Sequence, residues 1–84
     1  MRDEVQGCMT RLKELAAAPN NDPRPAAADI ARTFCATANK PDRERLKRAL
    51  DDARLIGLNT SVPAPFFAEH SRWLSAVESA RAAI

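Results

Sequence analysis

The sequence has no tyrosine, only two glycines and few β-branched residues. Because β-branched and aromatic side chains favour strands, their scarcity argues against a β-sheet. Two glycines cannot supply a Gly-rich phosphate-binding loop. The chain also lacks a long apolar run, and its first ten residues, MRDEVQGCMT, contain no apolar leader segment. We therefore expect a protein without strands that does not enter a membrane and works in the cytoplasm.

Residues suited to catalysis or metal binding are equally scarce. The two cysteines, Cys8 and Cys35, are too few for a disulfide scaffold and lack the spacing of a zinc site. The only histidine, His70, belongs to no nucleophile motif, and no serine lies in a G-x-S-x-G turn. The sequence predicts no catalytic residue, no cofactor and no metal, and hence a protein that is not an enzyme.

These same three residues are expected to have structural roles. An antiparallel pairing of the first two helices would bring Cys8 and Cys35 to the same level. We expect them to be neighbours, reduced in the cytoplasm but close enough that oxidation could bridge them. His70 lies on the apolar stripe of the last helix, and we expect it to be half buried and hydrogen-bonded.

Alanine is abundant, and hydrophobic residues make up 45% of the chain and charged residues 29%. This composition is typical of a globular domain rich in helix, and the excess of alanine and arginine is typical of a bacterial or phage genome of high GC content. The length suits one domain, residues 1–84. We predict an all-α, small four-helix bundle without β-strands, with helices at about residues 3–18, 25–38, 41–56 and 64–82.

Local signals set the limits of these helices. Asp3 and Asn39 are favourable first caps, and Pro19 ends the first helix. Asp22 with Pro23, or Pro25 alone, begins the second helix. Gly57 is predicted to end the third helix in a left-handed conformation.

Apolar residues at three- and four-residue spacing predict the core. Three of the four aromatic residues fall in the last helix, which is therefore expected to supply most of the core volume. Ala49 and Ile56 should widen the inner stripe of the third helix, and Phe66 should belong to the stripe of the last one. The predicted core residues are Val5, Met9, Leu12, Ile30, Phe34, Leu46, Leu50, Trp73, Leu74 and Val77.

The third helix, predicted at 41–56, has its charges in an unfavourable order. Its basic residues crowd the first half and Asp51 and Asp52 follow, whereas the helix dipole favours acids first and bases last. Leu55 points away from the apolar stripe. This arrangement predicts a non-enzymatic protein-binding module, such as an adaptor, a regulatory domain or an inhibitor, whose outer face meets an acidic partner surface. The predicted partner-binding residues are Arg43, Lys47, Arg48, Leu55, Leu58 and Phe67.

A helix-turn-helix DNA-binding protein is the alternative. The segment Ala28–Phe34 resembles the opening of such a motif, and residues 41–56 would form its recognition helix. The turn has no glycine, and the acidic residues of the third helix would repel phosphates. The net charge of +2 is also smaller than expected for a dedicated nucleic-acid binder. Protein binding is therefore the favoured hypothesis.

Overall fold

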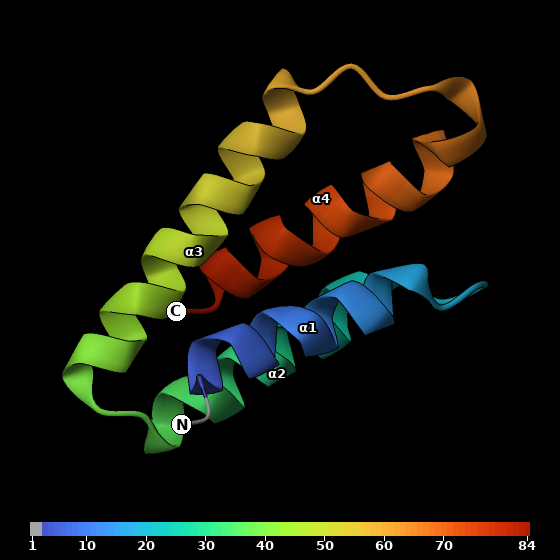
Figure 1. Ribbon diagram of the computed structural model, residues 1–84. Helices are drawn as coiled ribbons and strands as arrows, with labels where there is room; N and C mark the ends of the chain where they lie inside the picture. Colours follow the sequence, from blue (N-terminus) through green and yellow to red (C-terminus); the bar gives the residue numbers. More distant parts are fainter. Residues whose placement is uncertain (1–2) are drawn as a thin grey trace.

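The computed structural model describes residues 3–84, and these residues contain no β-strand. Four α-helices and one short 3₁₀ turn, η1, follow one another along the chain (Figure 1). This architecture confirms the predicted all-α four-helix bundle. The elements are α1 (Glu4–Ala17), α2 (Pro23–Thr37), α3 (Lys40–Asn59), η1 (Ala64–Phe66) and α4 (Phe67–Ala82).

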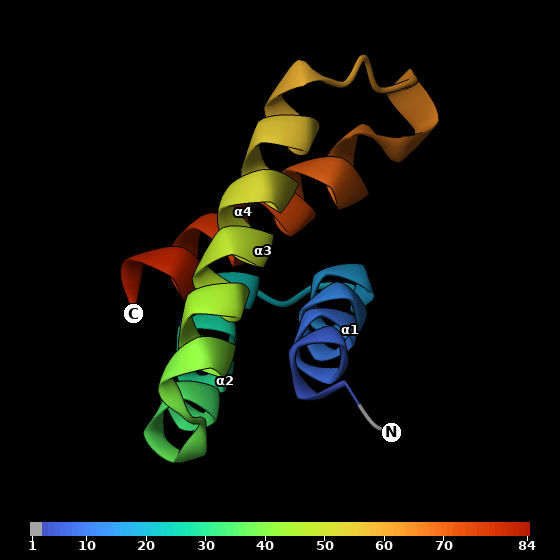
Figure 2. The same cartoon turned by 60° about the vertical axis from the view of Figure 1, so that its left-hand side comes forward.

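The helices form two antiparallel pairs, α1 with α2 and α3 with α4 (Figures 1 and 2). Helix α4 is the centre of the bundle because it packs against each of the other three, and most extensively against α2. Helices α2 and α3 share little packing although they follow each other directly. The last turns of α3 and the beginning of α4 extend beyond the bundle (Figure 2), which makes the molecule elongated, at 40 × 26 × 25 Å.

Side chains cap the first three helices as the sequence predicts. The Asp3 carboxylate accepts hydrogen bonds from the backbone N–H groups of Val5 and Gln6, at 3.0 and 3.2 Å. Asp22 accepts from Arg24 N–H at 3.1 Å, and Asn39 accepts from the N–H of Asp42 at 2.9 Å. These bonds satisfy donors that a helix start leaves without an intrahelical partner.

Helix α2 begins at Pro23, the first of the two predicted starts and two residues before residue 25, because Asp22 caps it and a proline is tolerated in the first turn. The predicted end of the third helix is wrong. Helix α3 does not end at Gly57 but continues to Asn59. Gly57 has no positive φ, so it does not form the left-handed cap that the sequence suggested.

Gly57 has a packing role in place of the predicted capping role. It is buried, and a Cβ atom added to it would lie 2.5 Å from Leu74 Cδ2 and 3.7 Å from His70 Cε1. Both neighbours belong to α4. The missing side chain therefore lets α4 approach α3 closely at the point where the bundle ends.

The buried core is built from one stripe of each helix, and small residues allow the closest approach. Ala27 and Ala31 of α2 and Ala76 and Ala80 of α4 are fully buried, which explains why these two helices pack so extensively. The core residues are Val5, Cys8, Met9, Leu12, Ala16, Ala27, Ala31, Leu46, Leu50, Ala76, Val77 and Ala80.

The largest side chains contribute less to this core than predicted. Ile30, Phe34 and Trp73 are only partly buried and pack on the margin of the core, and Leu74 is half buried as well. The two phenylalanines near the beginning of α4 lie outside the core altogether. The expectation that α4 supplies its bulk through aromatic residues is therefore wrong, and its buried residues are Ala76, Val77 and Ala80.

Candidate functional site

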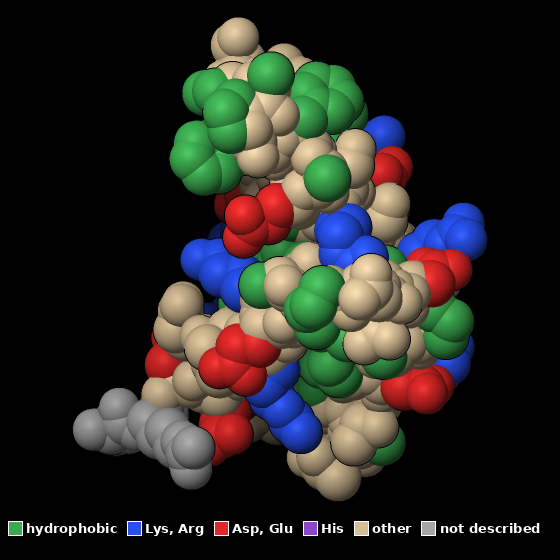
Figure 3. Space-filling view, turned by 90° about the vertical axis from the view of Figure 1, so that its right-hand side faces the viewer, with side chains coloured by type: hydrophobic (Ala, Val, Ile, Leu, Met, Phe, Trp, Pro, Cys, Tyr) green, Lys and Arg blue, Asp and Glu red, His purple; other side chains and the backbone are tan. Residues whose placement is uncertain are grey.

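Five large hydrophobic side chains lie exposed together where α3 ends and α4 begins. We call this set the apolar end. Figure 3 shows apolar side chains gathered over this part of the molecule. Soluble monomers rarely expose large contiguous apolar patches unless these bind something. The five residues and their exposed fractions are Leu55 54%, Ile56 67%, Leu58 53%, Phe66 58% and Phe67 64%.

The local structure explains why these side chains stay outside the core. Helix α3 continues past Gly57 and carries Leu58 beyond the bundle. After an extended segment, η1 begins behind Pro63 and positions Phe66 and Phe67 at the beginning of α4. Beyond Gly57, α3 and α4 separate (Figure 1), so α4 does not cover Leu58 and α3 does not cover Phe66 or Phe67. Leu55 and Ile56 lie before this point, and they are exposed because Leu55 points away from the bundle and Ile56 faces the hollow beside α1.

A hydrogen bond holds the two helices together just below the apolar end. His70 Nε2 lies 3.0 Å from the carbonyl oxygen of Gly57, and since a carbonyl only accepts, Nε2 is the donor. His70 is half buried, as predicted for a structural histidine. This bond fixes the position from which the apolar end projects.

Three of the predicted partner-binding residues, Leu55, Leu58 and Phe67, belong to the apolar end. Sequence reasoning missed Ile56 and Phe66 because both were expected to face inward, and the structure shows that this expectation is wrong for each of them. A signal was present: residues 55–68 contain no Asp, Glu, Lys or Arg. That uncharged run contains all five residues of the apolar end.

The three predicted basic residues lie in the other half of α3, away from the apolar end. The Arg43 guanidinium donates to Ala38 O at 2.6 Å. Lys47 forms an ion pair with Glu44 at 3.7 Å. Arg48 is exposed and forms no ion pair within residues 3–84. At about 1.5 Å rise per residue, Arg43 and Leu58 are about 22 Å apart along the helix, so the predicted set divides into two surfaces.

Contacts with other helices account for part of the unfavourable charge order on α3. Asp51 accepts a hydrogen bond from Arg81 of α4 at 3.0 Å, and Arg54 pairs with Glu78 of α4 at 3.3 Å. Near the beginning of α3, Arg45 pairs with Asp3 at 3.1 Å. An acid late in α3 and a base early in it therefore both have tertiary partners. The charge order by itself is thus weaker support for a binding face than the apolar end.

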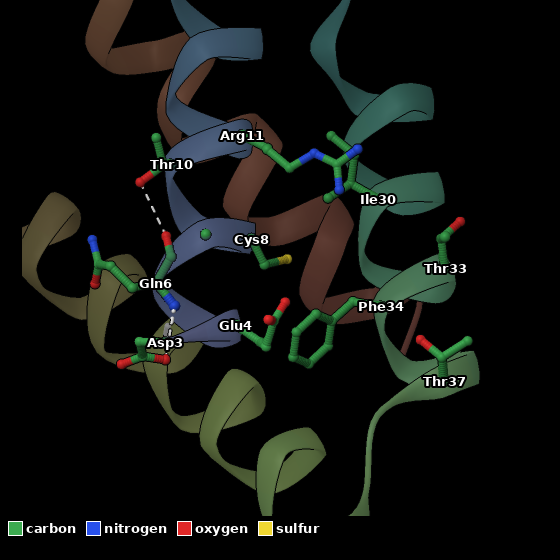
Figure 4. Close-up of a pocket in the computed structure, with 11 residues that line it drawn as sticks. Asp3, Glu4, Gln6, Cys8, Thr10, Arg11, Ile30, Thr33, Phe34 and Thr37 are labelled. Carbon is green, nitrogen blue, oxygen red and sulfur yellow. Dashed lines mark hydrogen bonds between the residues drawn. The ribbon is translucent and has the colours of Figure 1, made fainter. Parts of the chain in front are cut away.

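A hollow of about 670 Å³ lies between α1 and α2. Figure 4 shows the Cys8 thiol and the Phe34 ring directed into it from the two helices. Burial raises the pKa of Cys8, an effect that Arg11 opposes and Cys35 strengthens. A buried, protonated thiol is a poor nucleophile. Both cysteines are free thiols; Cys8 is buried and Cys35 is half buried.

A second hollow, of about 450 Å³, separates α1 from the α3–α4 pair. Its lining is largely apolar, including Met9, Ala53 and Trp73, and it reaches the apolar end through Ile56. The ammonium group of Lys13 lies 6.0 Å from the centroid of the Trp73 ring. This hollow extends the apolar surface along the side of the bundle.

Other kinds of site find no support in the part of the chain that the structure describes. Residues 3–84 contain no group of three or more His, Cys, Asp or Glu side chains that could hold a metal ion. None of the helices formed by these residues is both long and apolar enough to span a membrane.

Comparisons of the chain with known protein families, with curated proteins and with solved structures found no match.

Proposed function

We propose that this protein is a non-enzymatic protein-binding module that acts as an adaptor, regulatory domain or inhibitor of a larger partner. The observation that supports this proposal best is the apolar end. Its five large hydrophobic residues, each more than half exposed, lie together at one end of the molecule. Contact patches in proteins have an apolar centre of this kind.

Covering the side chains of the apolar end would contribute binding free energy. Full burial of a Leu, Ile or Phe side chain contributes about 1.5–3 kcal/mol. Since each side chain of the apolar end is only partly exposed, covering all five would contribute on the order of 5 kcal/mol. Loss of free motion offsets a large part of this gain. The apolar end therefore suits a reversible contact.

The basic half of α3 has a second role in the proposal. Arg43, Lys47 and Arg48 lie in the N-terminal half of α3 and suit an acidic partner surface. Exposed charges at the margin of an interface mainly set the association rate and its salt dependence. The pairing of Lys47 with Glu44 moderates this effect.

The packing of α2 and α3 bears on the DNA-binding alternative. A helix-turn-helix unit consists of two successive helices in a fixed mutual orientation, whereas α2 and α3 pack mainly on α4 and little on each other. Protein binding is therefore the better-supported function.

The test uses tagged full-length protein to isolate partners from the source cell and then to measure binding kinetics. Leu55→Asp should accelerate dissociation, because a charge replaces an apolar contact residue. The double variant Arg43→Glu and Lys47→Glu should slow association with little effect on the fold. Thr33→Asp, at an exposed position of α2 that borders the hollow between α1 and α2, is the matched control. Retention of DNA that is steeply salt-dependent, lost in the double variant and unaffected by Leu55→Asp, would contradict the proposal and favour DNA binding.

A further inference from the structure

The apolar end is electrically neutral. Residues 55–68 contain no charged side chain. Of the two flanking charges, Arg54 is paired with Glu78 at 3.3 Å, and Glu69 in the first turn of α4 is exposed at the margin of the apolar end. A partner selected by its charge finds no complementary charge on this surface. The surface that complements it is another neutral apolar patch, and each copy of the chain carries one.

We propose that the apolar end joins two copies of this chain in a two-fold symmetric dimer, in which Leu58 of each copy faces Phe67 of the other. The inference rests on the proposed function, since it names the partner of the same protein-binding surface. A two-fold interface uses one patch on both copies. The apolar end meets this requirement because α3 and α4 each contribute large apolar side chains to it.

The exposed area agrees with a weak dimer. At about 100 Å² for each half-exposed large side chain, the five residues expose about 500 Å² per copy, roughly a tenth of the total surface of 5588 Å². Two copies would bury at most about 1,000 Å², because Ile56 and Leu58 are two residues apart and point to opposite sides of α3. That area lies at the lower limit of specific interfaces, where contacts are transient.

The distribution of charge favours contact at this end. Each copy has a net charge of +2, so two copies repel each other weakly. The basic residues Arg43, Lys47 and Arg48 lie in the half of α3 away from the apolar end. End-to-end contact keeps these groups far apart relative to a Debye length of about 10 Å. The dimer would then present one basic half of α3 at each of its two outer ends.

The helix ends also suit this arrangement. The apolar end contains the C-terminal end of α3 and the N-terminal end of α4, which carry partial charges of opposite sign. A two-fold axis that brings Leu58 to Phe67 places the negative end of one helix beside the positive end of the other.

The experiment is sedimentation equilibrium of the purified full chain between ~1 μM and ~1 mM, a range that covers weak association. Two variants remove the apolar contact while suiting the local helix dipole: Phe67→Asp at the beginning of α4 and Leu58→Lys near the end of α3. Each should weaken dimerisation at least ~10-fold, which corresponds to the loss of one good contact. Ala36→Asp, on the part of α2 remote from the apolar end (Figure 1), should leave it unchanged.

Mixing the two variants tests the two-fold pairing. In a mixed dimer one contact becomes a lysine–aspartate pair and the other remains Leu58 with Phe67, so association should recover. Circular dichroism confirms that each variant is folded. A wild-type chain that stays monomeric throughout, a dimer that both variants retain, or a mixture that stays monomeric while the wild type dimerises would each overturn the inference. If the wild type is monomeric but Leu55→Asp still weakens binding to another protein, the inference fails and the proposed function stands.

Discussion

Leucines in the two halves of α3 have opposite environments. Leu46 and Leu50 are completely buried, whereas Leu55 and Leu58 are more than half exposed. Two causes explain the difference. Leu55 points away from the stripe that carries Leu46 and Leu50, whereas Leu58 lies beyond Gly57, the last position at which α4 packs closely on α3. A leucine on this helix therefore stabilises the fold only where it faces the bundle before Gly57.

Charges divide along the same boundary. Within the bundle, Arg81–Asp51 and Arg54–Glu78 connect α4 to α3, and Arg72 donates to the carbonyl oxygens of Ala16 and Ala18 at the end of α1. The apolar end contains no charged side chain. Polar contacts thus help to hold the helices of the bundle together. The apolar end has no charged side chains for such contacts and offers only hydrophobic surface.

The strongest way to test this comparison is to truncate one leucine on each side of the boundary. Leu50→Ala should lower the free energy of unfolding by about 2–5 kcal/mol, because it leaves a cavity in the core. Leu58→Ala should change it by less than about 0.5 kcal/mol. Urea denaturation of both variants, measured at low protein concentration, gives the two values. Similar losses at the two positions would mean that the boundary at Gly57 does not exist.

The two glycines provide a second matched pair, since both lie within helices. A Cβ atom added to Gly7 would meet open space, so Gly7→Ala should raise the free energy of unfolding by about 0.5–1 kcal/mol. The free energy of unfolding of Gly57→Ala should be about 1–3 kcal/mol lower than that of Gly7→Ala, because the new Cβ forces Leu74 to move. Thermal denaturation of the two variants measures this difference. An equal rise in the free energy of unfolding at both positions would show that the packing of α4 on α3 does not depend on the missing side chain of Gly57.

The bond between His70 and Gly57 can be removed without altering the apolar end. His70→Ala should cost about 0.5–1.5 kcal/mol, the usual contribution of one hydrogen bond. His70→Gln, which keeps a donor, should cost less and leave partner binding unchanged. Chemical denaturation and binding are measured together on both variants. Weaker binding at unchanged stability would make His70 a contact residue and not a structural one.

The smallest expected effect concerns the helix starts. Hydrogen bonds from the Arg24 side chain and backbone lower the pKa of Asp22 to about 2. The ionised Asp22 therefore stabilises the fold fully above its unfolded pKa near 3.8, and this contribution is lost as the pH falls through about 2. Helix α4, in contrast, has no side-chain cap. NMR titration of the Asp22 carboxyl group measures the midpoint, and a value near 3.8 would exclude the bond to Arg24.

Much of the fold could be predicted from local chemistry. Asp3, Asp22 and Asn39 cap three helices because their side chains accept hydrogen bonds from nearby N–H groups, which requires no distant partner. Leu46 and Leu50 were recognised as core residues from their spacing. The prediction failed where a distant segment decides the outcome, as at Gly57, whose role depends on Leu74.

The candidate site shows the same division. Leu55, Leu58 and Phe67 were predicted to be accessible, but Ile56 and Phe66 were assigned to the interior. Helical spacing places a residue on one side of its helix, and it does not say whether another helix covers that side. Ile56 lies next to Gly57, where α4 still packs on α3, and it is exposed because it faces the hollow between α1 and these two helices. Phe66 belongs to η1, beyond the point where α3 and α4 separate.

The sequence by itself therefore determined the helices, most of their ends and the stripe that each turns inward, because propensity, capping and periodicity act over a few residues. Only the tertiary structure decided where the core stops. Close packing of α4 on α3 requires the missing side chain of Gly57, and the two helices separate beyond it. The extent of the core depends on contacts between residues far apart in the chain, and these same contacts leave the apolar end exposed.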